Sequence, residues 1–202
     1  MAGAVPPEFK RGWQHALFTL QSSGAEGTHL AQSYRDLTEH ITNAGPDECS
    51  TVSNQLRFSG LVERACGHVA HIDRGVYQGA LALLANLTTI AVDPRAATTR
   101  EIARSCGGFW LCLPHLFSDD GLTVALTCGV VQNMVADVDA AQALQRSGGV
   151  ARLRELTKCG LPHVEVAAMA CLRNLRMGWR AAATRLQFGW LRCRVRQLAA
   201  TQ

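Results

Sequence analysis

The fold is decided by the segment SGGVARLRELTKCGLPHVEVAAMACLRNL (residues 147–175) and by two segments that share its frame. These are SGLVERACGHVAHIDRGVYQGALALLANL (59–87) and CGGFWLCLPHLFSDDGLTVALTCGVVQNM (106–134). In each, a glycine near the start is followed 26 residues later by an asparagine, giving the pairs Gly60–Asn86, Gly107–Asn133 and Gly148–Asn174. Three equal offsets indicate three copies of one structural unit.

The units lie 47 and then 41 residues apart, and the extra residues of the first step fall in the segment TTIAVDPRAATT (88–99). Each unit shows helical patterning without strand-like alternation. A short helix ends at the glycine, where a positive φ costs little, and a second helix follows. After a turn containing Asp or Pro comes a third helix rich in Ala, Gly and Cys. We therefore expect an all-α solenoid of helical repeats.

The closing runs ALLANL, GVVQNM and ACLRNL resemble armadillo repeats, whose third helix ends in a small–Leu–x–Asn–Leu type of run. HEAT repeats are the nearest similar class. The resemblance covers about residues 54–177 and implies a right-handed superhelical solenoid. Its three repeats are expected at approximately 54–93, 94–136 and 137–177. Residues 1–53 are expected to form a helical cap or degenerate repeat, because residues 28–45 have an amphipathic helical pattern. Residues 178–202 are expected to form a basic helix or extension.

The resemblance also implies a role for the third-helix asparagines, Asn86, Asn133 and Asn174. In armadillo proteins this asparagine lines a concave groove and can hydrogen-bond the backbone of an extended peptide. An amide side chain suits that role because it donates and accepts at once. The alternative is that the asparagines bond to neighbouring repeats and hold the stack together. Importin-type repeats carry a tryptophan four residues earlier, where this chain has Ala82, Gly129 and Ala170, so the sequence argues against binding of nuclear localisation signals.

Charge is unevenly distributed along the chain. The net charge is +4, but residues 166–202 contain seven arginines and no acidic residue, which leaves −3 on residues 1–165. Three interpretations of the tail stay open: a helix that caps the array, an extension, or a surface for RNA or another anionic partner. In the last case the candidate contact residues are Arg180, Arg185, Arg192, Arg194 and Arg196.

Residues with catalytic or metal-binding potential do not form a recognisable site. Cys66, His68 and His71 are close in sequence, but no second cluster completes a zinc site. The acidic pair at 119–120 falls in a turn, where such residues cap the next helix. No phosphate loop, nucleophile elbow or dinucleotide fingerprint occurs. We expect a protein that is not an enzyme and that uses no metal or cofactor.

The remaining expectations concern partners and location. Residues 75–92 lack charge but contain Gln78, Asn86 and two threonines, so we interpret them as a buried helix without membrane contact. The eight cysteines include no C-x-x-C pair, and no secretory signal is seen, which favours a cytoplasmic location with a nuclear one as the alternative. The expected function is a protein-interaction scaffold for another protein or an extended peptide. The alternative is an RNA-associated subunit that binds through the arginine-rich tail.

Overall fold

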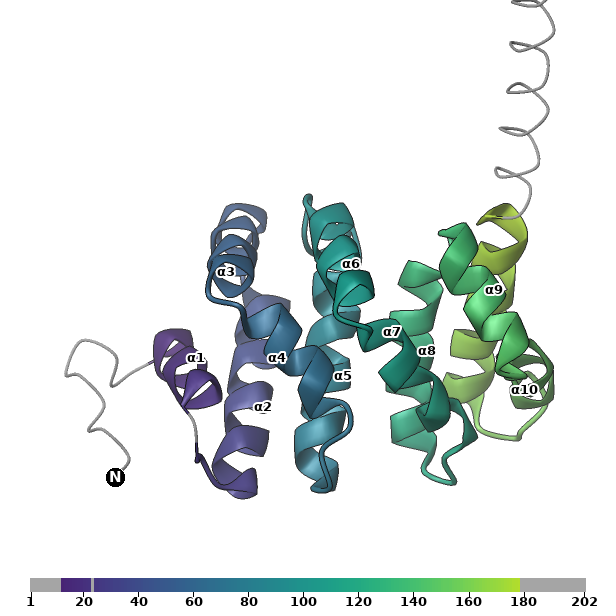
Figure 1. The fold of residues 1–202 in the computed structure, drawn as a ribbon, viewed down its shortest axis with the longest axis horizontal. Coiled ribbons are helices and arrows are strands. Elements are labelled where there is room, and N and C mark those ends of the chain that lie inside the picture. The colour runs from purple at the N-terminus through teal and green to yellow at the C-terminus, as the bar shows by residue number, and fades with distance from the viewer. Residues whose placement is uncertain (1–11, 23, 179–202) are drawn as a thin grey trace, which may run out of the picture.

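The structure, a computed structural model, describes residues 12–22 and 24–178, and this part of the chain is built from helices with no strand. The helices stack side by side along one axis as an all-α solenoid (Figure 1). Three units of three helices follow one another, and a pair of helices precedes them. The predicted fold class is therefore confirmed.

The helices of the three units have the following bounds. The first unit contains α3 (Pro46–Phe58), α4 (Leu61–His68) and α5 (Arg74–Leu87). The second contains α6 (Ala96–Ser105), α7 (Gly108–Cys112), the 3₁₀ helix η2 (Leu113–Phe117) and α8 (Gly121–Met134). The third contains α9 (Val138–Arg146), α10 (Gly149–Leu156) and a third helix over residues 162–178. The preceding pair is α1 (Trp13–Gln21) and α2 (Gly27–Asn43).

The break between the first and second helix of each unit is made by a left-handed glycine. Gly60, Gly107 and Gly148 have φ values of 73°, 75° and 77° and stand directly before α4, α7 and α10. An L-residue with a side chain adopts this conformation only with strain, which explains why glycine recurs at this position of the repeat. The placement expected from the sequence is confirmed.

The second helix of the middle unit departs from its expected form. It is α-helical only to Cys112 and continues as the 3₁₀ helix η2. The cause is Pro114, which has no N–H for an α-helical hydrogen bond and stands at the start of the 3₁₀ segment.

Aspartates start the third helix in two of the units. The Asp73 carboxylate accepts a hydrogen bond from the Val76 N–H at 3.1 Å, and the Asp120 carboxylate accepts one from the Thr123 N–H at 2.8 Å. The expected capping role of the acidic turn at 119–120 is thus seen at Asp120. In the last unit Leu161 stands at the corresponding position and is exposed.

The first helix of the first unit begins earlier than the approximate boundary expected at residue 54. Pro46 occupies the first turn of α3, where its missing N–H needs no partner, and the helix runs from there to Phe58. The 26-residue spacing could not locate this start, because it relates only the second and third helices. Ahead of it, α2 packs on α5 as α5 packs on α8.

The core runs between the helix layers, and the uncharged segment 75–92 lies mostly within it. In α5 the side chains of Val76, Leu81, Leu83, Leu84 and Leu87 are all buried. Among the described residues, no helix is both long enough and apolar enough to cross a membrane.

Candidate partner-binding surface

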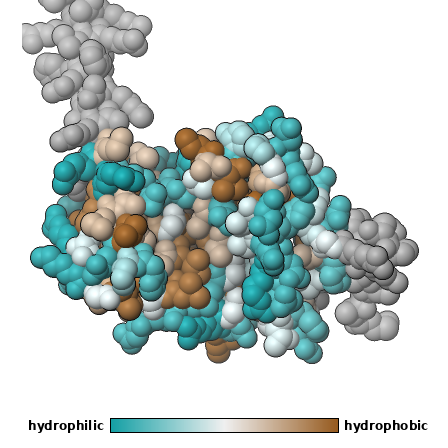
Figure 2. Space-filling model, turned by 180° about the vertical axis from the view of Figure 1, so that it is seen from behind, coloured by the Kyte–Doolittle hydropathy of each residue, from teal (hydrophilic) through white to brown (hydrophobic). Residues whose placement is uncertain are grey.

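The third helices form one continuous face of the solenoid. We define the third-helix surface as the outward sides of α2, α5, α8 and helix 162–178. In Figure 1, α2, α5 and α8 lie behind the first and second helices, and Figure 2 views the molecule from that side. A hydrophobic strip crosses the middle of this view, and hydrophilic side chains dominate toward the N-terminal end.

The outward stripe of α8 supplies apolar residues to this surface. Leu122 is 53% exposed, and Ala125, Leu126 and Gly129 follow it at helical spacing and are partly buried. A Cβ atom added at Gly129 would lie 3.1 Å from the Cβ of Ala85. The small residues here therefore reflect the close approach of α8 to α5. Small residues therefore keep the surface shallow along this contact.

Two of the three asparagines bond to the preceding unit. The Asn133 Nδ2 donates to the Ala85 carbonyl at 2.9 Å and to the Thr88 hydroxyl at 3.1 Å. The Asn174 Nδ2 donates to the Gln132 carbonyl at 3.0 Å. In each case the acceptor carbonyl belongs to the residue just before the corresponding asparagine of the previous unit. These bonds match the stack-holding alternative: the Asn133 amide nitrogen makes two of them, whereas that of Asn174 makes one and keeps a second N–H.

Asn86 differs from its two counterparts. Its side chain makes no hydrogen bond with any residue in the described part of the chain, although it is only partly exposed. Asn86 is therefore the asparagine whose whole amide is available to a partner.

A hollow lies between α2 and α5 on the same surface, with a volume of about 520 Å³. The α2 side is polar and the α5 side consists of small residues. The lining residues are Tyr34, Arg35, Thr38, Glu39, Thr42, Asn43, Gly79 and Ala82. Sequence reasoning missed this hollow, because residues 28–45 carry no repeat spacing that would place them beside α5.

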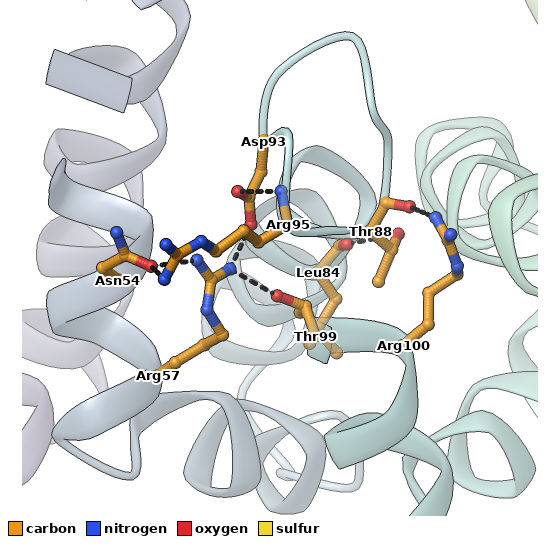
Figure 3. A network of polar contacts seen from close by, with 8 residues as sticks. All are labelled: Asn54, Arg57, Leu84, Thr88, Asp93, Arg95, Thr99 and Arg100. Atoms are coloured by element: carbon orange, nitrogen blue, oxygen red, sulfur yellow. Dashed lines mark hydrogen bonds and ion pairs between the residues drawn. The ribbon is translucent and has the colours of Figure 1, made fainter. Parts of the chain in front are cut away.

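On the opposite side of the solenoid, a buried ion pair joins the first two units (Figure 3). The Arg57 guanidinium of α3 contacts the Asp93 carboxylate, and their side chains are 7% and 0% exposed. Arg57 also donates to the Asn54 side-chain oxygen at 2.6 Å and to the Thr99 hydroxyl at 2.9 Å. Asp93 accepts in addition from the Arg95 N–H at 2.9 Å, a bond within the long connection 88–95, and its contact with Arg57 joins this connection to α3.

The same contact recurs one unit later in a more open setting. Arg104 of α6 pairs with Asp137, and the two side chains are 37% and 39% exposed. Arg57 and Arg104 both stand three residues before the left-handed glycine of their unit, and this shared position is the sequence signal for the arginine–aspartate contact. Gln145 occupies this position in the last unit, so the arginine contact is not repeated there.

The histidines near Cys66 have structural partners. The His68 Nδ1 lies 2.9 Å from the Tyr34 hydroxyl, and the His71 Nδ1 accepts from the Asp73 N–H at 3.0 Å. Burial, followed by the nearby His71 and Arg64, lowers the pKa of His68. No group of three or more His, Cys, Asp or Glu in the described part of the chain is arranged to hold a metal ion.

The tail arginines proposed from the sequence, Arg180, Arg185, Arg192, Arg194 and Arg196, lie outside the described residues. So does the segment 179–202 as a whole, and the structure does not address its three interpretations.

Comparisons with known proteins identify the architecture. No family model and no curated protein sequence matches the chain. Among solved structures, a designed armadillo repeat protein superposes with a TM-score of 0.64 at 16% identity, over 79% of this chain and 63% of its own. The chain has an armadillo-like repeat fold. An engineered protein is similar at a TM-score of 0.66 and 22% identity, over 81% of this chain and 63% of its own.

A second designed armadillo repeat protein, in complex with the peptide (KR)4, is similar at a TM-score of 0.62 and 12% identity. The superposition covers 81% of this chain and 69% of the designed protein. The armadillo-like chain thus spans a little under two thirds of the first similar structures. At these identities the likeness establishes the fold, and it confirms the family resemblance seen in the closing runs of the repeats.

Proposed function

We propose that the protein is a non-catalytic interaction scaffold whose third-helix surface binds an extended segment of a partner protein. The observation that carries this proposal is the exposed apolar stripe of α8 in the middle of a surface with polar groups beside it. Contiguous apolar surface flanked by polar groups is typical of interaction sites. The similar designed proteins bear on the proposal because one of them is in complex with a peptide.

The asparagines contribute in two ways to the proposed contact. Asn86 offers both the donor and the acceptor of its amide to a passing backbone. Asn133 offers its side-chain oxygen, because its amide nitrogen already makes two bonds within the stack, and Asn174 offers its oxygen and one remaining N–H. A partner backbone that passes these asparagines would therefore present N–H groups toward their oxygens. Apolar side chains of the partner would lie against Leu126 and, farther along α8, against Leu122.

The test compares two apolar residues of equal exposure on opposite sides of the solenoid. Leu122 on α8 is 53% exposed, and Trp110 on α7 is 54% exposed. Peptides selected from a random display library on the wild-type chain would be titrated against Leu122→Asp and Trp110→Asp. An aspartate in the first turn of α8 suits the helix dipole, so Leu122→Asp should leave the fold intact, which far-UV circular dichroism would verify.

We expect Leu122→Asp to weaken the selected peptides by about tenfold or more, equivalent to about 1.4 kcal/mol. Trp110→Asp should leave their affinity within about twofold, a change well under 1 kcal/mol. Equal binding by wild type and Leu122→Asp, or a loss confined to Trp110→Asp, would show that the partner surface is not the third-helix surface.

A further inference from the structure

The hollow between α2 and α5 has a defined shape. On the α5 side, Gly79 and Ala82 present no atoms beyond a Cβ. Gly79 has no room for more, because a Cβ added there would lie 2.4 Å from the Cβ of Tyr34. This close contact holds the two helices together at the base of the hollow. Its volume of about 520 Å³ lies within the range of about 300–1,000 Å³ that is usual for ligand sites.

The charges on the α2 side restrict what can enter. Arg35 and Glu39 stand one helical turn apart in the lining and carry opposite charges. The Arg35 guanidinium donates to the Gln32 side-chain oxygen at 2.6 Å, which orients it. The Glu39 carboxylate makes no hydrogen bond or ion pair with the described residues. Because the two charges are opposite and only one turn apart, their fields largely cancel across the hollow, which selects neither a cation nor an anion, so we consider an uncharged side chain as the occupant.

An aromatic side chain with a hydrogen-bond donor fits both the shape of the hollow and its balanced charges. Its ring can lie against Ala82, and a guanidinium group such as that of Arg35 stacks favourably on an aromatic face. Its N–H or O–H can donate to the free carboxylate of Glu39, a charge-assisted hydrogen bond. Tryptophan and tyrosine combine an apolar body with such a donor and are frequent anchors at protein interfaces.

We propose that the α2–α5 hollow is a subsite for a tryptophan or tyrosine side chain of the bound partner. The inference rests on the proposed function, because the hollow opens on the third-helix surface beside Asn86. It adds a preference for an aromatic residue in the partner, which the apolar stripe of α8 alone does not predict.

The first experiment uses amino-acid amides as probes on the full chain. N-acetyl-tryptophanamide, N-acetyl-tyrosinamide, N-acetyl-leucinamide and N-acetyl-lysinamide would be titrated while the backbone amide signals of Gly79 and Ala82 are followed by NMR. We expect saturable shifts with the tryptophan and tyrosine probes and weaker ones with the other two. Equal shifts with the lysine or leucine probe, or shifts that avoid these amides, would overturn the proposal.

Variants then locate the contact. Ala82→Phe fills the hollow and should abolish the saturable shifts of Gly79. Glu39→Gln keeps the shape and should weaken the tryptophan probe by about threefold, as expected for losing the ionic part of one exposed hydrogen bond. Glu63→Gln is the matched control, an exposed glutamate of α4 without a hydrogen bond or ion pair, and should change nothing. Unaltered probe binding in both Ala82→Phe and Glu39→Gln would refute the site.

Failure here is distinguishable from failure of the proposed function. Library peptides that depend on Leu122 but lack aromatic residues, and that bind Glu39→Gln as well as wild type, would remove the subsite while keeping the scaffold. Loss of the Leu122 dependence would remove the scaffold proposal itself.

Discussion

The two arginine–aspartate contacts between units predict very different losses of unfolding free energy when the aspartate is replaced by asparagine. Asp93→Asn removes the charge partner of Arg57, which is 7% exposed and cannot recover hydration. Breaking a buried pair in this way typically costs about 3–5 kcal/mol of unfolding free energy. Because Arg57 keeps its bonds to Asn54 and Thr99, we expect the lower end, about 3 kcal/mol.

Asp137→Asn is the matched change in a solvated setting. Its pair with Arg104 is more than one third exposed on both sides, so the ionic contribution should be about 0–1 kcal/mol. Asparagine also retains the N-cap of α9, since it is as good a cap as aspartate. The two variants should therefore differ by at least about 2 kcal/mol in unfolding free energy.

Urea unfolding followed by far-UV circular dichroism would measure both variants. The slope of the transition must be compared as well, because a repeat protein can lose its end units separately. A double variant, Arg57→Met with Asp93→Leu, should recover most of the loss, since it buries no charge. Equal destabilisation by Asp93→Asn and Asp137→Asn would refute the argument that burial sets the cost.

Three further predictions concern other contacts. Gly79→Ala should cost about 1–3 kcal/mol in thermal or urea unfolding, because its Cβ would overlap Tyr34; an unchanged midpoint would contradict the close contact. Asn133→Ala should cost about 1 kcal/mol while Asn86→Ala stays within about 0.5 kcal/mol, and reversal of that order in the same assay would show that the hydrogen bonds are misassigned. The lowered pKa of His68 means that the unfolded chain binds its proton more readily. Stability should therefore fall as the pH drops below the unfolded value of about 6.5, and His68→Gln should reduce that dependence in urea titrations between pH 7.5 and 5.5.

The sequence contained enough to predict the solenoid because its determinants are local. A left-handed glycine is needed at residues 60, 107 and 148 whatever surrounds it, and the asparagine follows at a fixed distance. The armadillo-like fold could therefore be inferred from three short segments. The 3₁₀ turn at Pro114 was equally local, and its signal was simply outweighed by the pattern of the neighbouring repeats.

The roles of the polar residues could not be predicted in the same way. The acceptors of Asn133 and Asn174 are backbone carbonyls, which leave no mark in the sequence. Arg57 and Arg104 hold equivalent positions, but their partners lie at different distances along the chain because the connection 88–95 is longer than its counterpart 135–137. The α2–α5 hollow depends on where an end pair without repeat spacing packs, and only the three-dimensional arrangement shows it.

The missing asparagine bond at α2 has a mechanical consequence. From α5 onward, each contact between neighbouring third helices is tied by an asparagine, and the joint between the first two units is also clamped at its far edge by Arg57 and Asp93. The joint between α2 and α5 is held in another way, by the close contact of Gly79 with Tyr34 and by the hydrogen bond between the Tyr34 hydroxyl and His68. An occupant of the hollow would lie at the edge of this joint, so its binding would restrict rotation of the end pair α1–α2 against the first unit.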